Sequence, residues 1–151
     1  MNLAFVVNNL GNSDCNYSLV KMINKIGDDN SKISPFIFYM NALPPIIAPN
    51  CLAMNISGLS NYNGTAVAIG IEAADIVRKN NSNTTNWLYM WDIIWMTTIL
   101  NYKTCIDILK DFKIVARSES HKKIIENYTG RKDILIAEDM NELYKCLTSK
   151  N

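Results

Sequence analysis

Short apolar runs alternate with segments of helical periodicity along the chain, and this alternation constrains the fold more than any other feature. The runs that we expect to form strands cover residues 3–7, 35–40, 51–56, 65–69, 87–90, 113–116 and 133–137. Apolar residues at helical spacing predict helices at about 17–26, 71–79, 102–110, 118–128 and 139–147. Such alternation gives parallel strands joined by right-handed crossovers. The sequence therefore predicts an α/β protein with a three-layer, Rossmann-like and mostly parallel sheet.

Residues with capping side chains stand where these helices should begin and end. The expected N-terminal caps are Ser13 or Asp14, Ser118, and Asp139 or Asn141. Gly130 stands where the fourth helix should stop. These local signals agree with the periodicity, which strengthens the prediction of strand–helix alternation.

The overall composition predicts one ordinary globular domain over residues 1–151. The chain is 48% hydrophobic and 19% charged, with a net charge of +1, so no global field attracts nucleic acid or a membrane. A contact with DNA would have to come from a local patch. The four cysteines are scattered without metal-ligand spacing (Cys15, Cys51, Cys105 and Cys146). We therefore expect reduced thiols, no structural metal site and no cofactor.

We expect a cytoplasmic protein without a membrane-spanning segment. The apolar stretch 87–100 is shorter than the roughly 20 residues that cross a bilayer, and Asp92 interrupts it. The first apolar run, 3–7, lacks the basic flank of a signal peptide and ends at once in two asparagines.

Polar residues follow several predicted strands at their carboxyl ends, where ligands bind in parallel α/β sheets. The first such loop contains Asn8, Asn9 and Gly11 and leads to Asp14 at a helix N-terminus. Free amide groups at such a terminus favour an anion such as a phosphate. With one glycine, the loop is neither a P-loop nor a dinucleotide fingerprint, and it is equally consistent with a plain capped turn. Gly70 closes a later strand at the same edge.

The segment 91–95 places a carboxylate among aromatic side chains. Asp92 lies between Trp91 and Trp95, and burial there without a partner would be costly. Asp92 therefore either caps a helix or lies at a site where aromatic rings stack on a sugar or base. In the second case it could act as a general base, with a pKa raised by apolar surroundings. The two tryptophans could equally be core anchors.

The segment 117–122 follows a strand and opens a helix. Arg117 offers a bidentate fork for phosphate, and Ser118 can donate to the same oxygens. His121 is the single histidine of the chain, so an imidazole acid or base would have to be this residue, although a solvated surface histidine is the simpler reading. A local excess of positive charge could contact phosphates or simply face water. Its members are Lys113, Arg117, Lys122, Lys123, Arg131 and Lys132.

The stretch 112–141 resembles the segment that closes the N-terminal Rossmann domain of GT-B glycosyltransferases. The resemblance rests on a strand, the pair Ser118-Glu119, Lys122 and Glu126 at helical spacing, and a final strand with an acidic turn. The opening strand and glycine loop are similar to those of the same domain. The chain also looks like small glycosyltransferase-like proteins of tailed phages in the T-even group, some of which add sugars to hydroxylated cytosine in DNA.

This resemblance implies a sugar transferase that uses a nucleotide sugar as co-substrate. Asn9 and Gly11 would approach the acceptor or phosphate, Asp92 would deprotonate the acceptor hydroxyl, and Arg117 with Ser118 would neutralise the leaving diphosphate. GT-B enzymes carry most donor contacts on a second Rossmann domain, which would begin about where residue 151 lies. The resemblance thus implies donor binding across a homodimer, or a fold retained without transfer.

Three functions follow as hypotheses from the sequence. The first is transfer of a pentose or hexose to a hydroxyl, with modified cytosine in DNA as the acceptor. The second is a non-enzymatic protein that binds a nucleotide or a host protein, for example a phage anti-defence factor. The third is an assembly partner for another subunit, which predicts an exposed apolar patch.

Overall fold

The computed structural model describes residues 2–28, 33–80, 84–93 and 100–149. Within these residues, seven parallel strands form one sheet in the order β3-β2-β1-β4-β5-β6-β7. The strands are β1 (Asn2–Asn9), β2 (Ser34–Asn41), β3 (Leu52–Asn55), β4 (Thr65–Ile69), β5 (Thr85–Met90), β6 (Lys113–Ala116) and β7 (Leu135–Ile136). The predicted Rossmann-like, three-layer α/β fold is confirmed, and the sheet is entirely parallel.

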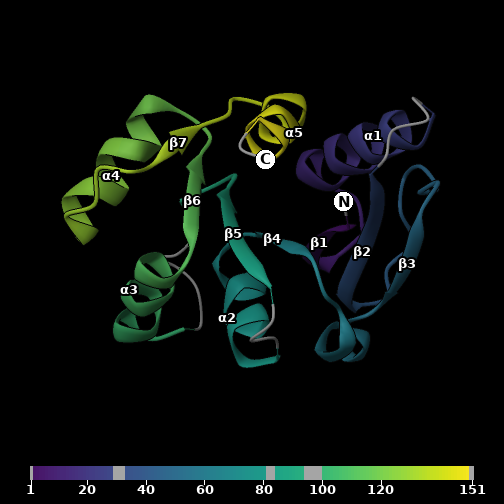
Figure 1. Cartoon of the computed structure of the whole chain (residues 1–151), viewed down its shortest axis with the longest axis horizontal. Helices are drawn as coiled ribbons and strands as arrows, with labels where there is room; N and C mark the ends of the chain where they lie inside the picture. Colours follow the sequence, from purple (N-terminus) through teal and green to yellow (C-terminus); the bar gives the residue numbers. More distant parts are fainter. Residues whose placement is uncertain (1, 29–32, 81–83, 94–99, 150–151) are drawn as a thin grey trace.

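Helices cover both faces of this sheet, as Figure 1 shows. They are α1 (Asp14–Asp28), α2 (Ile71–Asn80), α3 (Tyr102–Asp111), α4 (Glu119–Thr129) and α5 (Met140–Thr148), with a 3₁₀ helix η1 (Ile56–Asn61). Helices α1 and α5 pack on one face, whereas α2, α3 and α4 pack on the other. Each face therefore has its own apolar core. None of the described helices is long and apolar enough to cross a membrane.

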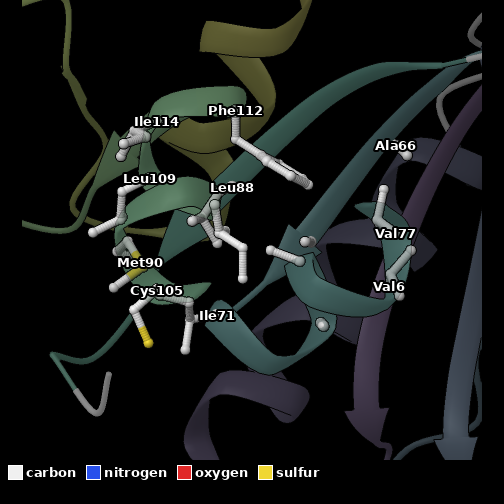
Figure 2. Close-up of a cluster of buried hydrophobic side chains, with 14 of the residues drawn as sticks. Val6, Ala66, Ile71, Val77, Leu88, Met90, Cys105, Leu109, Phe112 and Ile114 are labelled. Carbon is white, nitrogen blue, oxygen red and sulfur yellow. The ribbon is translucent and has the colours of Figure 1, made fainter. Parts of the chain in front are cut away.

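The central strand β1 is apolar throughout its middle because both of its faces are buried. Ala4 and Val6 point into the core beneath α2, whereas Leu3, Phe5 and Val7 point into the core beneath α1 and α5. Figure 2 shows the first of these cores, where side chains from β1, β4, β5, α2 and α3 converge. The continuous apolar run thus predicted this strand correctly.

The sheet extends from β1 in two opposite directions. The chain first builds outward through β2 and β3, and then returns to add β4 on the other side of β1, with Leu3 opposite Thr65. The carboxyl ends of β1 and β4 therefore form a topological switch point, where loops diverge and leave room for a ligand.

The helix caps follow the predicted chemistry, and the structure decides between the two alternatives at α1 and at α5. Ser118 Oγ accepts from the amide of His121 at 3.2 Å, and Gly130 ends α4. Asp139, not Asn141, caps α5. Ser13 caps α1, since its Oγ accepts from the amide of the third helical residue at 3.1 Å.

We predict that Gly64→Ala lowers the free energy of unfolding by about 2 kcal/mol. Gly64 has a φ of +153°, and a Cβ there would lie 2.7 Å from the carbonyl oxygen of Asn2. Urea denaturation followed by circular dichroism measures the change. Gly27→Ala is the matched control, because a Cβ on this α1 residue meets no atom closer than 3.6 Å. The free energy of unfolding of that variant should rise by about 0.5–1 kcal/mol. An equal loss of unfolding free energy in both variants would contradict the argument.

Candidate functional site

A cavity of about 730 Å³ opens at the carboxyl edge of the sheet, in the size range of small-molecule sites. It lies where β1, β4, β5 and β6 end and where α1 begins. The residues that line it are Val7, Asn8, Asn9, Gly11, Asn12, Ser13, Asp14, Cys15, Asn16, Leu43, Ile69, Trp91, Asp92 and Arg117. We call it the switch-point cavity.

Seven of the residues predicted from the sequence line this cavity. They are Asn8, Asn9, Gly11, Asp14, Trp91, Asp92 and Arg117. Strand order is what brings them together, because β1, β5 and β6 end at the same edge although their residues are far apart in the sequence. Trp95 lies outside the described residues. Cys15, Asn16 and Leu43 also line the cavity, and the sequence analysis missed them as site residues.

The loop after β1 is held in shape by two asparagine side chains. The amide of Gly11 donates to Asn9 Oδ1 at 2.9 Å, and Asn16 Nδ2 donates to the carbonyl of Gly11 at 2.9 Å. A Cβ at Gly11 would lie 3.1 Å from both Asn9 Oδ1 and Leu43 Cδ1. This position therefore favours glycine because the loop is tightly packed.

The N-terminus of α1 offers backbone donors to the cavity. Ser13 accepts from the amides of Asn16 and Tyr17 through its hydroxyl and carbonyl oxygens. Across the described ranges, the amides of Asp14 and Cys15 have no hydrogen-bond partner. Unpaired amides and the helix dipole together favour an anionic group at this point.

Arg117 is positioned by an aromatic stack. Its guanidinium carbon lies 4.0 Å from the centre of the Trp91 ring, a cation–π geometry. Trp91 in turn meets the Tyr89 ring edge-on at 6.1 Å, and the Tyr89 hydroxyl donates to the carbonyl of Ala137 at 2.9 Å. The stacked rings therefore hold the Arg117 guanidinium in place at the cavity, and Arg117 covers one face of the Trp91 ring.

Asp92 lies in the same cavity as Arg117, but it is exposed. The sequence left open whether the aromatic neighbours of Asp92 enclose its carboxylate, and the structure places this carboxylate at the surface. The chain turns after Met90, so that Asp92 leaves the core that Trp87 and Tyr89 enter. A helix beginning at Asp92 would fall on residues 94–99, outside the described part.

The charges around the cavity are mixed. The carboxylates of Asp14 and Asp92 oppose the single guanidinium of Arg117 among the described lining residues. Charge alone does not attract a polyanion here. The lining does provide separate groups for a phosphate and for hydroxyls, since carboxylate and amide oxygens accept hydrogen bonds from hydroxyls.

Asn8 lines the cavity and is hydrogen-bonded to the first turn of α2. Its Nδ2 donates to Glu72 Oε2 at 2.7 Å, which fixes the orientation of the amide. Its Oδ1 is buried and has no partner among the described residues. Gly70, predicted at this edge, is not part of the cavity lining, and its amide donates to the carbonyl of Tyr89 at 3.0 Å.

The remaining predicted residues lie on or beside α4 and do not line the cavity. Ser118 caps the helix, and its Oγ accepts from the amide of His121. Glu119 is exposed in the first turn, and Lys122 is half-buried one turn later. His121 is also half-buried, and its Nδ1 lacks a partner in the part of the chain that the structure describes.

The predicted basic patch is divided between the two ends of the sheet. Lys113 begins β6, whereas Arg117 follows the carboxyl end of the same strand. Arg131 lies with Lys113, because its Nη1 donates at 2.6 Å to the carbonyl of the residue before β6. Only Lys122 and Lys123 stay near Arg117, in the first half of α4. A single patch spanning 113–132 is therefore not formed.

Cys15 faces the cavity from the first turn of α1. Burial, assisted by the negative charge of Asp92 and opposed by Arg117, raises the pKa of its thiol to about 12. The thiol is therefore neutral near pH 7 and acts as a weak donor rather than a nucleophile. Across residues 2–28, 33–80, 84–93 and 100–149, no cluster of three His, Cys, Asp or Glu side chains could hold a metal ion.

No protein-family model matches the sequence, and no curated protein is significantly similar to it. The resemblance to glycosyltransferases therefore stays a prediction, and the function has to be argued from the cavity itself.

We predict that Cys15 reacts slowly with iodoacetamide. An ordinary cysteine ionises near pH 8.5, whereas the pKa of Cys15 is raised to about 12. Because the thiolate is the nucleophile, alkylation of Cys15 at about pH 8 should be at least ~100-fold slower than that of free cysteine. Mass spectrometry over a time course, with free cysteine added to the protein sample, measures the alkylation rates of Cys15 and of free cysteine together. The same protein in urea should react at the free-cysteine rate, and fast alkylation of the folded protein would refute the assignment.

Proposed function

We propose that the switch-point cavity binds a nucleotide sugar and that the protein transfers its sugar to an acceptor hydroxyl. One observation carries the proposal: Arg117 and Asp92 line one cavity, beside amides at the N-terminus of α1 that have no hydrogen-bond partner among the described residues. This combination supplies a cation and amide donors for a diphosphate, together with a carboxylate for a hydroxyl.

The diphosphate would lie between the N-terminus of α1 and Arg117. The Trp91 stack fixes the guanidinium before the ligand arrives, which reduces the ordering cost of binding. The side chain of Asn8 offers a buried oxygen that has no partner in the described part of the chain, and a hydroxyl or amino group of the ligand would satisfy it after a small local shift.

In the transfer step, Asp92 would act as the general base. Its carboxylate takes the proton of the acceptor hydroxyl while that oxygen forms a bond to the anomeric carbon of the sugar. The bond from this carbon to the diphosphate breaks, and its electron pair goes to the phosphate oxygen. Arg117 and the α1 amides stabilise the negative charge that develops on the diphosphate. Asp92 then releases its proton to water.

The proposed acceptor is modified cytosine in DNA, as the resemblance implies. Lys122 and Lys123 lie in the first half of α4, at the edge of the sheet where the cavity opens. They would contact the phosphates of DNA, whereas the other basic residues of the predicted patch would not.

A second candidate function is ligand binding without transfer. It is favoured by the exposure of Asp92, because a carboxylate in water is a poor match for a base held in a closed site. The same contacts from Arg117 and the α1 amides would then bind a nucleotide, and no sugar transfer would follow.

We predict that Arg117→Ala weakens the binding of nucleoside diphosphates by about 10- to 100-fold, because a charged hydrogen bond contributes about 1.5–3 kcal/mol. Isothermal titration calorimetry measures the affinity. Arg78→Ala is the matched control, since Arg78 pairs with Asp111 at 3.3 Å and does not line the cavity. Equal affinities for both variants would remove Arg117 from the site.

We predict that Asp92→Asn lowers the rate of sugar transfer by about 10²–10⁴-fold while nucleotide affinity and folding stay unchanged. The assay incubates hydroxymethylcytosine DNA with the protein and a panel of nucleotide sugars, followed by mass spectrometry of the nucleosides. A pentose or hexose mass increment with the wild type identifies the donor. Tight nucleotide binding without any increment would instead establish the binding function.

A further inference from the structure

A second, apolar cavity of about 340 Å³ lies next to the switch-point cavity, above β2 and β3. Its lining includes Leu10, Tyr39, Leu43, Pro44, Pro45 and Ala53. The chain between β2 and β3 forms one wall, and the prolines make that wall stiff. The two cavities differ in chemistry, because this one has no charged residue in its lining.

The two cavities adjoin at Leu43, which lines both. A Cβ on Gly11 would lie 3.1 Å from Leu43 Cδ1, so this side chain packs directly on the loop after β1. Leu43 itself is 50% exposed and its neighbour Ile46 is 54% exposed. A ligand held at the loop therefore has an apolar surface within reach on its β2 side.

We infer that the apolar cavity holds the nucleobase of the proposed ligand. This inference rests on the proposed function and adds an orientation to it. A flat ring that covers Tyr39 and Leu43 removes apolar surface from water, which favours binding. The diphosphate then follows along the loop after β1, and the sugar extends toward Asp92 at the end of β5.

The strand order supports this orientation. β2 and β5 are separated by β1 and β4, so the ends of these two strands lie about three strand spacings apart, or about 14 Å. Base, diphosphate and sugar are consecutive parts of one molecule, and they would occupy consecutive strand ends. The reverse orientation would place the hydroxyl-rich sugar against prolines and the apolar ring against carboxylates.

The test compares two kinds of probe by calorimetry on the full chain: inorganic pyrophosphate, and the diphosphates of uridine, cytidine, guanosine and adenosine. We expect at least one nucleoside diphosphate to bind tenfold or more tightly than pyrophosphate. Ala53→Phe, which places a phenyl ring in the apolar cavity where the nucleobase would lie, should bring that affinity down to the pyrophosphate value and leave pyrophosphate binding unchanged.

Two further variants control for indirect effects. Leu52→Phe changes the neighbouring residue of β3, which is 55% exposed and does not line the cavity, and it should have no effect. Ala42→Asp places a charge in the exposed part of the lining and should reproduce the loss even if Ala53→Phe does not fold.

The outcomes separate this inference from the proposed function. Equal affinities for pyrophosphate and all four nucleotides would overturn the inference alone, as would a nucleoside diphosphate that keeps its affinity in both Ala53→Phe and Ala42→Asp. If neither probe binds the wild type, the proposed function and the inference both fail.

Discussion

The burial of β1 on both faces is the constraint on which the rest of the structure depends. Leu3, Phe5 and Val7 anchor α1 and α5, whereas Ala4 and Val6 anchor the layer beneath α2. Because β1 then has a strand on each side, its carboxyl end becomes the point where the chain diverges. The cavity, the position of the α1 N-terminus beside it and the packed loop at Gly11 all follow from that divergence.

Much of the fold could be predicted from the sequence because local chemistry determines it. Apolar runs of strand length, the Ser118 cap and the Gly130 stop need only neighbouring residues to be recognised. The candidate site was predicted in part, since polar residues at strand ends meet wherever the strands are adjacent. The meeting of Asp92 with Arg117 could not be predicted, because it depends on β5 pairing with β6.

Two features near the site could not be decided from the sequence. The aromatic neighbours of Asp92 along the chain left its burial open, and the structure shows that a turn after β5 exposes it. The basic residues of segment 113–132 could have contacted phosphates or faced water, and the intervening strand β6 places Lys113 and Arg117 at opposite ends of the sheet. In both cases, residues that are close along the chain are separated in space.

The strand order also has a consequence for folding during synthesis. β1, β2 and β3 can pair before residues 65–69 leave the ribosome. β4 then adds to the free side of β1, and β5, β6 and β7 add in order beyond it. Each new strand therefore meets one growing edge, already positioned by its predecessor, which shortens the search that slows parallel sheets. Until β4 arrives, however, one edge of the apolar strand β1 has unpaired backbone groups, so chains stalled between η1 and β4 are the ones most prone to aggregate.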